Sequence, residues 1–117
     1  MKNFLCEEKH CVKVSSLNEE NACLVCKVSK TLKVMSDITR LKILFCLLDK
    51  EKCVCELQEL TNSSQSLISH QLCSLRKANL IGFRKEGNRV FYFLKDDHVK
   101  KILDIVQEHV LEEENEN

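Results

Sequence analysis

Three groups of residues in this sequence have the types and the spacing to bind metal ions or nucleic acid. Cys53 and Cys55 form a Cys-x-Cys pair at the predicted start of a helix, where backbone N–H groups favour the thiolate form. Two thiolates do not complete a metal site, so further donors must come from elsewhere. Cys6 and Cys11 near the N-terminus are available, with His10 in reserve. Four thiolates would prefer cadmium, lead or zinc over magnesium or calcium.

A second group lies on the predicted last helix, residues 96–113, and consists of Asp96, His98, His109 and Glu112. His98 and His109 share a helix face but lie about 16 Å apart along the axis, so one ion cannot reach both from a single helix. Two antiparallel copies would solve this, because Asp96 and His98 of one chain would meet His109 and Glu112 of the other. Two nitrogen and two oxygen donors suit tetrahedral zinc. The alternative is a pair of ordinary surface histidines beside a dimer interface, and spacing alone does not separate the two.

The third group is a polar helix face between residues 53 and 80, where two short helices flank the break Thr61-Asn62-Ser63. Apolar residues at three-and-four spacing predict one covered side, formed by Leu57, Leu60, Leu67, Ile68, Leu72 and Leu75. The other side of the second helix carries Gln65, Ser66, Ser69 and His70. These uncharged hydrogen-bonding side chains suit base edges and phosphates in a major groove, where a helix-turn-helix inserts its second helix. A plain solvated surface is the alternative.

Residues 81–94, IGFRKEGNRVFYFL, form the only strand-like stretch of the sequence. Its centre, Glu86 to Arg89, favours a tight hairpin. A helix-turn-helix followed by a basic hairpin predicts a winged helix, with Arg84, Lys85 and Arg89 placed to contact the DNA backbone or minor groove. A hairpin that only completes the core would explain the aromatic residues but not the basic tip.

The length of 117 residues predicts one domain, mainly α with one β-hairpin. We expect a flexible N-terminal arm over residues 1–18, a winged helix-turn-helix domain over 19–113 and an acidic tail over 114–117. The first helix carries a stripe of Val25, Val28, Leu32 and Met35. Asp37 is expected to cap a second helix whose buried face comprises Ile38, Leu41, Leu44, Phe45 and Leu48.

The last helix has an apolar stripe of Val99, Ile102, Leu103, Val106 and Val110, which a monomer would expose. A two-fold dimer formed through the first and last helices would bury it and would match a palindromic operator. The formal net charge is zero, yet basic residues outnumber acidic ones from Ser63 to Lys95. Such a local basic patch can contact phosphates in a salt-dependent way.

No apolar run is long enough to span a bilayer and no signal-peptide core is present, so we expect a cytoplasmic protein without a membrane partner. Eight cysteines then predict thiols or metal ligands rather than a disulfide framework. Cys23 and Cys26 form a Cys-x-x-Cys pair beside the apolar stripe of the first helix. Cys46 and Cys73 are expected to be packing residues.

These motifs together resemble the ArsR/SmtB family of metal-sensing winged-helix repressors, from about Ser29 to Glu112. The resemblance rests on SDITRLKIL, KCVCEL, SSQSLISHQLCSLRKANLI and FRKEGNRVFYFL, together with the Asp96-x-His98 and His109-x-x-Glu112 pairs. It implies a homodimer that binds operator DNA when metal-free and releases it on binding metal, turning on efflux or sequestration genes.

The resemblance also assigns roles to individual residues. It implies that the polar face of residues 65–70 reads DNA and that the last helix holds a zinc site. It further implies that Cys6, Cys11, Cys53 and Cys55 form a thiolate site, as in the cadmium- and lead-responsive CadC branch. Gln58 stands where arsenic sensors of the family often add a third cysteine, so an arsenite- or antimonite-responsive repressor is the less favoured member of the same fold.

Two other classes of function are weighed against this one. A thiol redox protein using Cys23 and Cys26 lacks the βαβ context that such a motif needs. A zinc-storage or metal-delivery protein would leave the helix-turn-helix without a role. No catalytic triad, phosphate loop or HExxH motif occurs, so we do not expect an enzyme.

Overall fold

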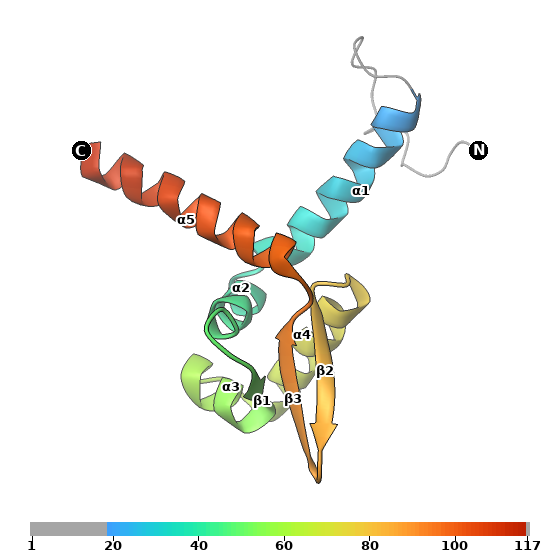
Figure 1. Cartoon of the computed structure of the whole chain (residues 1–117), viewed down its shortest axis with the longest axis vertical. Coiled ribbons are helices and arrows are strands. Elements are labelled where there is room, and N and C mark those ends of the chain that lie inside the picture. The colour runs from blue at the N-terminus through green and yellow to red at the C-terminus, as the bar shows by residue number, and fades with distance from the viewer. Residues whose placement is uncertain (1–18, 117) are drawn as a thin grey trace. The chain divides into compact units, whose positions relative to one another are not determined.

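The computed structural model describes residues 19–116, which belong to two compact units. The first contains helix α1 (Glu19–Ser36). The second, from Asp37 onward, holds α2 (Ile38–Cys46), β1 (Lys52–Cys53), α3 (Val54–Thr61), α4 (Gln65–Lys77), β2 (Ile81–Glu86), β3 (Arg89–Leu94) and α5 (Asp97–Glu116) (Figure 1). None of these helices is long and apolar enough to cross a membrane.

Short polar residues set the helix boundaries of the second unit. The Asp37 carboxylate accepts a hydrogen bond from Arg40 N at 3.0 Å and so begins α2, as the sequence predicts. Ser64 does the same for α4 by accepting from Leu67 N at 3.1 Å. Asn62 ends α3 in the left-handed region with φ +55°, a conformation that asparagine tolerates. The predicted break between the two helices is therefore confirmed.

The core lies where α2, α3 and α4 pack together. Its fully buried side chains are Ile43, Leu44, Leu57, Ile68, Leu72 and Leu75. Each such side chain contributes about 1.5–3 kcal/mol relative to leaving it in water. Burial of this cluster fixes the second helix of the helix-turn-helix against the first.

The prediction of which apolar side chains are buried in α2, α3 and α4 is only partly correct. Ile38 and Phe45 of α2 are 65% and 42% exposed, while Ile43 and Leu47 are buried in their place. Leu60 and Leu67, also expected in the core, are 59% and 38% exposed. Periodicity identifies an apolar stripe but not which edge of it meets a neighbouring helix.

The predicted hairpin is confirmed, and it belongs to a three-stranded antiparallel sheet of order β1-β3-β2. Gly87 begins its two-residue loop with φ +64°, a placement of glycine that a type II′ turn favours. Gly82 faces Phe93 across the pair, and a Cβ at Gly82 would lie 2.7 Å from that ring. The short strand β1, which the sequence does not predict, pairs with β3 through Lys52–Tyr92 and Cys53–Phe91.

Apolar side chains remain exposed on the first and last helices. On α1 the exposed residues include the predicted Val25, Val28 and Leu32. On α5, Val99 and Leu103 are buried, whereas Ile102, Val106 and Val110 are exposed. A single copy of the chain therefore leaves part of the predicted α5 stripe in water. The helix itself continues to Glu116, beyond the predicted end near residue 113.

Leu57→Ala should lower the free energy of unfolding by about 2–5 kcal/mol, because it opens a cavity in the fully buried core. Leu60→Ala in the same helix is the matched control, expected to cost about 0.5 kcal/mol or less since its side chain is exposed. Urea unfolding followed by circular dichroism measures both. Equal losses in the two variants would contradict this account of the core.

Candidate nucleic-acid and metal-binding sites

The polar face of α4 is open to solvent. Its four predicted DNA-reading residues, Gln65, Ser66, Ser69 and His70, are all exposed. The opposite side of the helix is held in the core by Ile68, Leu72 and Leu75. A helix fixed on one side and lined on the other with uncharged hydrogen-bonding groups can enter a major groove without losing its packing.

A buried glutamine that the sequence analysis missed also fixes α4. Gln71 is 8% exposed, and its Oε1 accepts a hydrogen bond from Arg40 Nη1 at 2.9 Å. Its Nε2 donates to the Asp37 carboxylate at 3.4 Å. The carboxylate that caps α2 thus also holds α4. No pattern in the sequence identifies this residue, because glutamine is common on exposed helix faces.

The three predicted basic residues of the hairpin, which we call the wing (residues 81–94), have different surroundings. Arg84 is ion-paired with Glu51 at 2.8 Å and with Glu86 at 3.2 Å. Arg89 donates from Nη2 to the Cys53 sulfur at 3.3 Å. Lys85 is exposed and makes no ion pair within residues 19–116.

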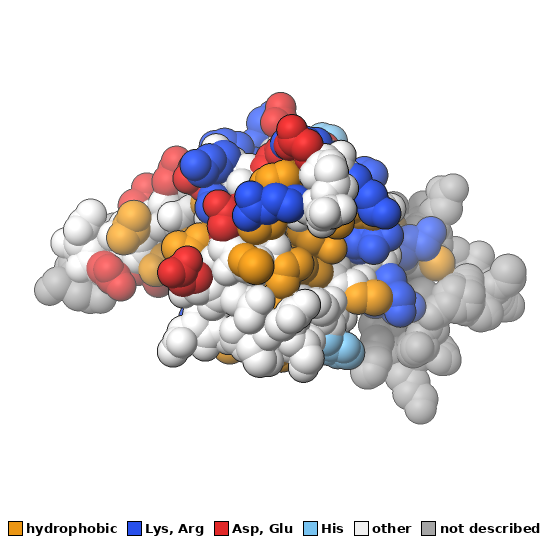
Figure 2. All heavy atoms as spheres, turned by 90° about the horizontal axis from the view of Figure 1, so that it is seen from below, with side chains coloured by type: hydrophobic (Ala, Val, Ile, Leu, Met, Phe, Trp, Pro, Cys, Tyr) orange, Lys and Arg blue, Asp and Glu red, His pale blue; other side chains and the backbone are white. Residues whose placement is uncertain are grey.

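The wing points toward the face drawn in Figure 2. On that face, lysine and arginine side chains, with acidic side chains among them, surround an exposed apolar area. Arg76 of α4 adds to the local positive charge and lies over the Phe83 ring, 4.4 Å from its centroid. A cation held on an aromatic face keeps its charge at the surface, where a phosphate can reach it.

Cys53 and Cys55 are free thiols at the start of α3, as predicted. Cys53 ends β1 and is 4% exposed, whereas Cys55 lies in the first helical turn and is exposed. The Cys53 N–H donates to the Glu56 carboxylate at 2.9 Å. That hydrogen bond is the main cause of a lowered Glu56 pKa. The thiol pair therefore sits on a well-defined helix start.

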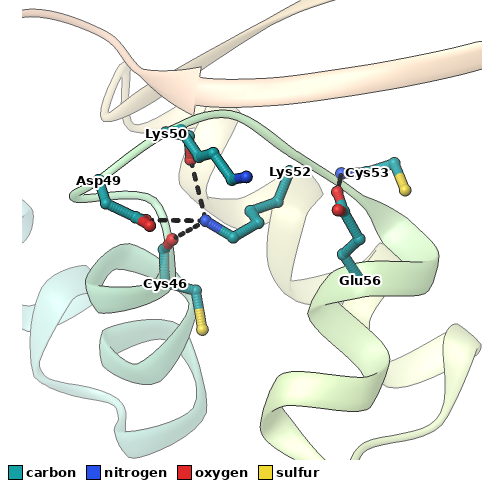
Figure 3. A network of polar contacts seen from close by, with 6 residues as sticks. All are labelled: Cys46, Asp49, Lys50, Lys52, Cys53 and Glu56. Carbon is teal, nitrogen blue, oxygen red and sulfur yellow. Dashed lines mark hydrogen bonds and ion pairs between the residues drawn. The ribbon is translucent and has the colours of Figure 1, made fainter.

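A buried lysine fixes the loop that leads to this pair (Figure 3). Lys52 is 7% exposed, and its ammonium group donates three hydrogen bonds, to the Cys46 carbonyl (2.8 Å), the Asp49 carboxylate (2.8 Å) and the Lys50 carbonyl (3.2 Å). All three of its donors are thereby used. The hydrogen bond from Lys52 lowers the Asp49 pKa. The cation also satisfies a carbonyl at the end of α2.

The thiol pair fits a thiophilic ion by donor type but supplies only two donors. Within residues 19–116, no group of three or more Cys, His, Asp or Glu side chains stands ready to hold a metal. The proposed completing ligands, Cys6 and Cys11, and the reserve donor His10 lie outside the described residues. Completion of the site therefore remains a prediction.

The remaining cysteines differ from one another. Cys23 is half-buried. Cys26 is disulfide-bonded, so the expectation of thiols or metal ligands is wrong for this residue. Cys46 is partly buried, and burial raises its pKa, in keeping with a packing role. Cys73 is exposed, so the packing role predicted for it is wrong. It lies on α4 outside the stripe that faces the core.

The predicted donors of α5 lie at its two ends. Asp96 precedes the helix and accepts from the backbone N–H groups of His98 (3.0 Å) and Val99 (3.3 Å). Although desolvation raises the Asp96 pKa, these hydrogen bonds lower it overall. His98 Nδ1 lies 3.5 Å from the Asp96 carboxylate, so the first half of the predicted donor set is together.

At the other end of α5, His109 Nε2 lies 3.5 Å from the Glu113 carboxylate. The partner donor predicted from the sequence is Glu112, one residue earlier. Both histidines are exposed, and a site that joins the two ends requires a second copy of the chain. The inter-subunit set therefore also stays a prediction.

Comparison with known proteins places the chain in a family. The model described as bacterial regulatory protein, arsR family, matches residues 37–82. A cadmium resistance transcriptional regulatory protein CadC from Listeria innocua is 31% identical over 110 residues, covering 90% of this chain and 92% of the relative. The chain belongs to the arsR family of bacterial regulatory proteins. The match to the family model spans α2, α3 and α4 and ends at the second residue of β2.

Another arsR-family relative is a CadC homolog, a cadmium resistance transcriptional regulatory protein from Staphylococcus aureus, 41% identical over 78 residues. The alignment covers 66% of this chain and 64% of that relative, a little under two thirds of its length. Among solved structures, the homodimeric winged helix-turn-helix DNA-binding domain of a possible ArsR-family regulator from Mycobacterium bovis matches with a TM-score of 0.78. It has 24% identity and covers 89% of this chain and 96% of that one. The fold is a winged helix-turn-helix.

Glu56→Gln should make stability less dependent on pH in the acid range. The charged Glu56 stabilises the folded chain above its unfolded-state pKa, and this contribution is lost as the pH falls through the lowered folded-state pKa. The variant should therefore be less stable than the wild type at pH 7, and the difference should close as the pH falls below 4.5, the ordinary value for this carboxyl. Urea unfolding at a series of pH values measures the difference in free energy of unfolding between the variant and the wild type.

The matched control is Glu59→Gln on the same helix, because the Glu59 side chain is exposed and makes no hydrogen bond within the described part of the chain. It should leave the pH dependence unchanged. A Glu56→Gln variant whose stability tracked the wild type at every pH would contradict the role of this carboxylate at the helix start.

Proposed function

We propose that this arsR-family chain is a transcriptional repressor that binds operator DNA as a homodimer and releases it on binding a thiophilic divalent ion, cadmium, lead or zinc. The observation that carries the proposal is the free thiol pair Cys53 and Cys55 at the start of α3, within the helix-turn-helix itself. The named function of the CadC relatives, cadmium resistance regulation, supports the choice of ion.

The DNA-binding half of the proposal follows from α4 and the wing. The exposed polar face of α4 would read base edges, while Lys85 and the wing arginines would contact phosphates. Two recognition helices about one turn of DNA apart would engage the two half-sites of an operator. The exposed apolar residues of α1 and α5 would form the dimer interface that sets this spacing.

The sensing half follows from where the thiols lie. Cys55 is open to solvent and Cys53 is buried at the end of β1, so together they offer one exposed and one buried soft donor. Donors from the N-terminal arm, Cys6 and Cys11, would complete the set. The Asp96, His98, His109 and Glu112 set would form a second, inter-subunit site for zinc.

Release of DNA requires the ion to bind the arrangement of low DNA affinity more tightly than the other arrangement. A coupling free energy of about 3 kcal/mol corresponds to roughly a hundredfold weaker operator binding. Lys52 bears on this coupling, because its three hydrogen bonds make the segment before Cys53 rigid. A change at the sulfur would therefore reach β3, with which Cys53 pairs, rather than distort the loop.

A titration of operator binding with cadmium tests which site drives release. Cys53→Ser/Cys55→Ser should bind DNA like the wild type but should no longer be released by the ion. His98→Ala/His109→Ala should still be released. Fluorescence anisotropy of a duplex from upstream of the chain's own gene reports both. Full release of the double serine variant would show that another site senses the ion.

Gln65→Ala and Ser69→Ala test the reading face of α4. Each should weaken binding to the operator duplex by about 1–3 kcal/mol, because a base contact is lost. Binding to a duplex of scrambled sequence should not change, since that binding depends on phosphates. Anisotropy with the two duplexes at one salt concentration measures the difference. An equal loss on both would mean that these side chains contact the backbone only.

A further inference from the structure

One contact joins the predicted metal-binding thiol to the wing. Arg89, the first residue of β3, donates from Nη2 to the Cys53 sulfur at 3.3 Å. Cys53 is opposite Phe91 in the β1–β3 pair, and the Arg89 guanidinium also lies over the Phe91 ring, 5.6 Å from its centroid. The guanidinium is thus held in the corner between the wing and the start of α3.

A second contact ties the wing to the same segment. Arg84 Nε donates to Glu51 at 2.8 Å, two residues before Cys53, and its guanidinium lies over Phe91 at 4.9 Å. Both wing arginines are therefore engaged with residues 51–53 or with the strand that pairs with them. Lys85, between them in sequence, has no ion pair in the described residues. Lys85 is therefore available to a phosphate. Arg84 and Arg89 would have to exchange their contacts with Glu51 and Cys53 for a phosphate.

We propose that Arg89 couples Cys53 to DNA: its guanidinium contacts the DNA backbone in the metal-free repressor and is retained by the Cys53 sulfur when that sulfur ligates an ion. The inference rests on the proposed function and identifies how its sensing site and its DNA contact communicate. Arg89 is a positioning residue here, since it binds neither the ion nor a base.

The physical basis is competition between two acceptors for one cation. A thiol is a weak hydrogen-bond acceptor, so a phosphate outcompetes it for the guanidinium. A ligating sulfur is a thiolate, whose negative charge a divalent ion shared by several thiolates neutralises only in part. Hydrogen bonds between charged partners are roughly twice as strong as neutral ones, so a ligating Cys53 holds Arg89 more firmly. Ion binding then removes one phosphate contact from the wing.

Thermodynamic reciprocity gives the second consequence. If retention of Arg89 by the sulfur weakens DNA binding, then DNA binding must weaken ion binding by the same factor. Loss of the guanidinium should therefore reduce, by the same factor, the effect of the ion on DNA affinity and the effect of DNA on ion affinity. A residue that only contacts phosphate should change DNA affinity without changing this factor.

The test compares Arg89→Gln with the matched control Lys85→Gln in the full chain, using cadmium chloride and the duplex from upstream of the gene. In the metal-free state both variants should bind DNA more weakly, and each should lower the slope of log affinity against log salt by about 0.9. The ratio of DNA affinities without and with cadmium should fall about tenfold in Arg89→Gln and stay at the wild-type value in Lys85→Gln.

An independent readout is cadmium affinity without DNA, followed by the sulfur-to-cadmium charge-transfer absorbance. Arg89→Gln should bind cadmium more weakly than Lys85→Gln, because only Arg89 contacts the ligating sulfur. Arg89 is exposed, so both variants should fold like the wild type, and thermal unfolding verifies this. If cadmium lowers the DNA affinity of Arg89→Gln by the same factor as that of Lys85→Gln, the inference is overturned.

The proposed function and the role of Arg89 can be refuted separately. A wild-type chain whose DNA binding did not respond to cadmium would refute the proposed function. A wild-type chain that released DNA normally, with Arg89→Gln releasing it equally well, would refute only the role of Arg89.

Discussion

The pairing of two residues, Lys52 and Cys53, with strand β3 is the constraint on which the arrangement of the candidate sites depends. It places a thiol beside the wing and at the same time begins α3. A strand this short could not persist alone, but the buried Lys52 ammonium joins it to the Cys46 carbonyl at the end of α2 and to the Lys50 carbonyl in the loop that follows. The Cys53 thiol, the wing and the helix-turn-helix are thereby joined within the second unit.

Different faces of the second unit have different surroundings. The leucine and isoleucine cluster of α2, α3 and α4 holds the recognition helix from behind, and Gln71 holds it from the side. Exposed apolar residues are left on α5, away from this cluster. The polar face of α4 and the exposed apolar residues of α5 thus lie on separate surfaces of the unit.

The sequence was sufficient for the features that depend on local pattern. Three-and-four spacing predicted the helices, Asp37 predicted a cap, and the residues around Gly87 predicted the turn. What it could not predict depends on tertiary contact. The ion pair of Arg84 with Glu51 spans 33 residues, and a buried Lys52 contradicts the usual exposure of lysine. Whether Leu60 is exposed depends on which edge of its apolar stripe α2 covers. Whether the predicted donors of α5 come together depends on a second copy of the chain.

Asp37 has a consequence for how DNA recognition could change over evolution. Its carboxylate both starts α2 and accepts from Gln71 of α4, so the position of the polar face of α4 depends in part on a residue outside that face. A substitution at Asp37 or Arg40 would tilt the reading surface as a whole. New operator preferences could then arise in one mutational step, with every residue that touches the bases left as it was.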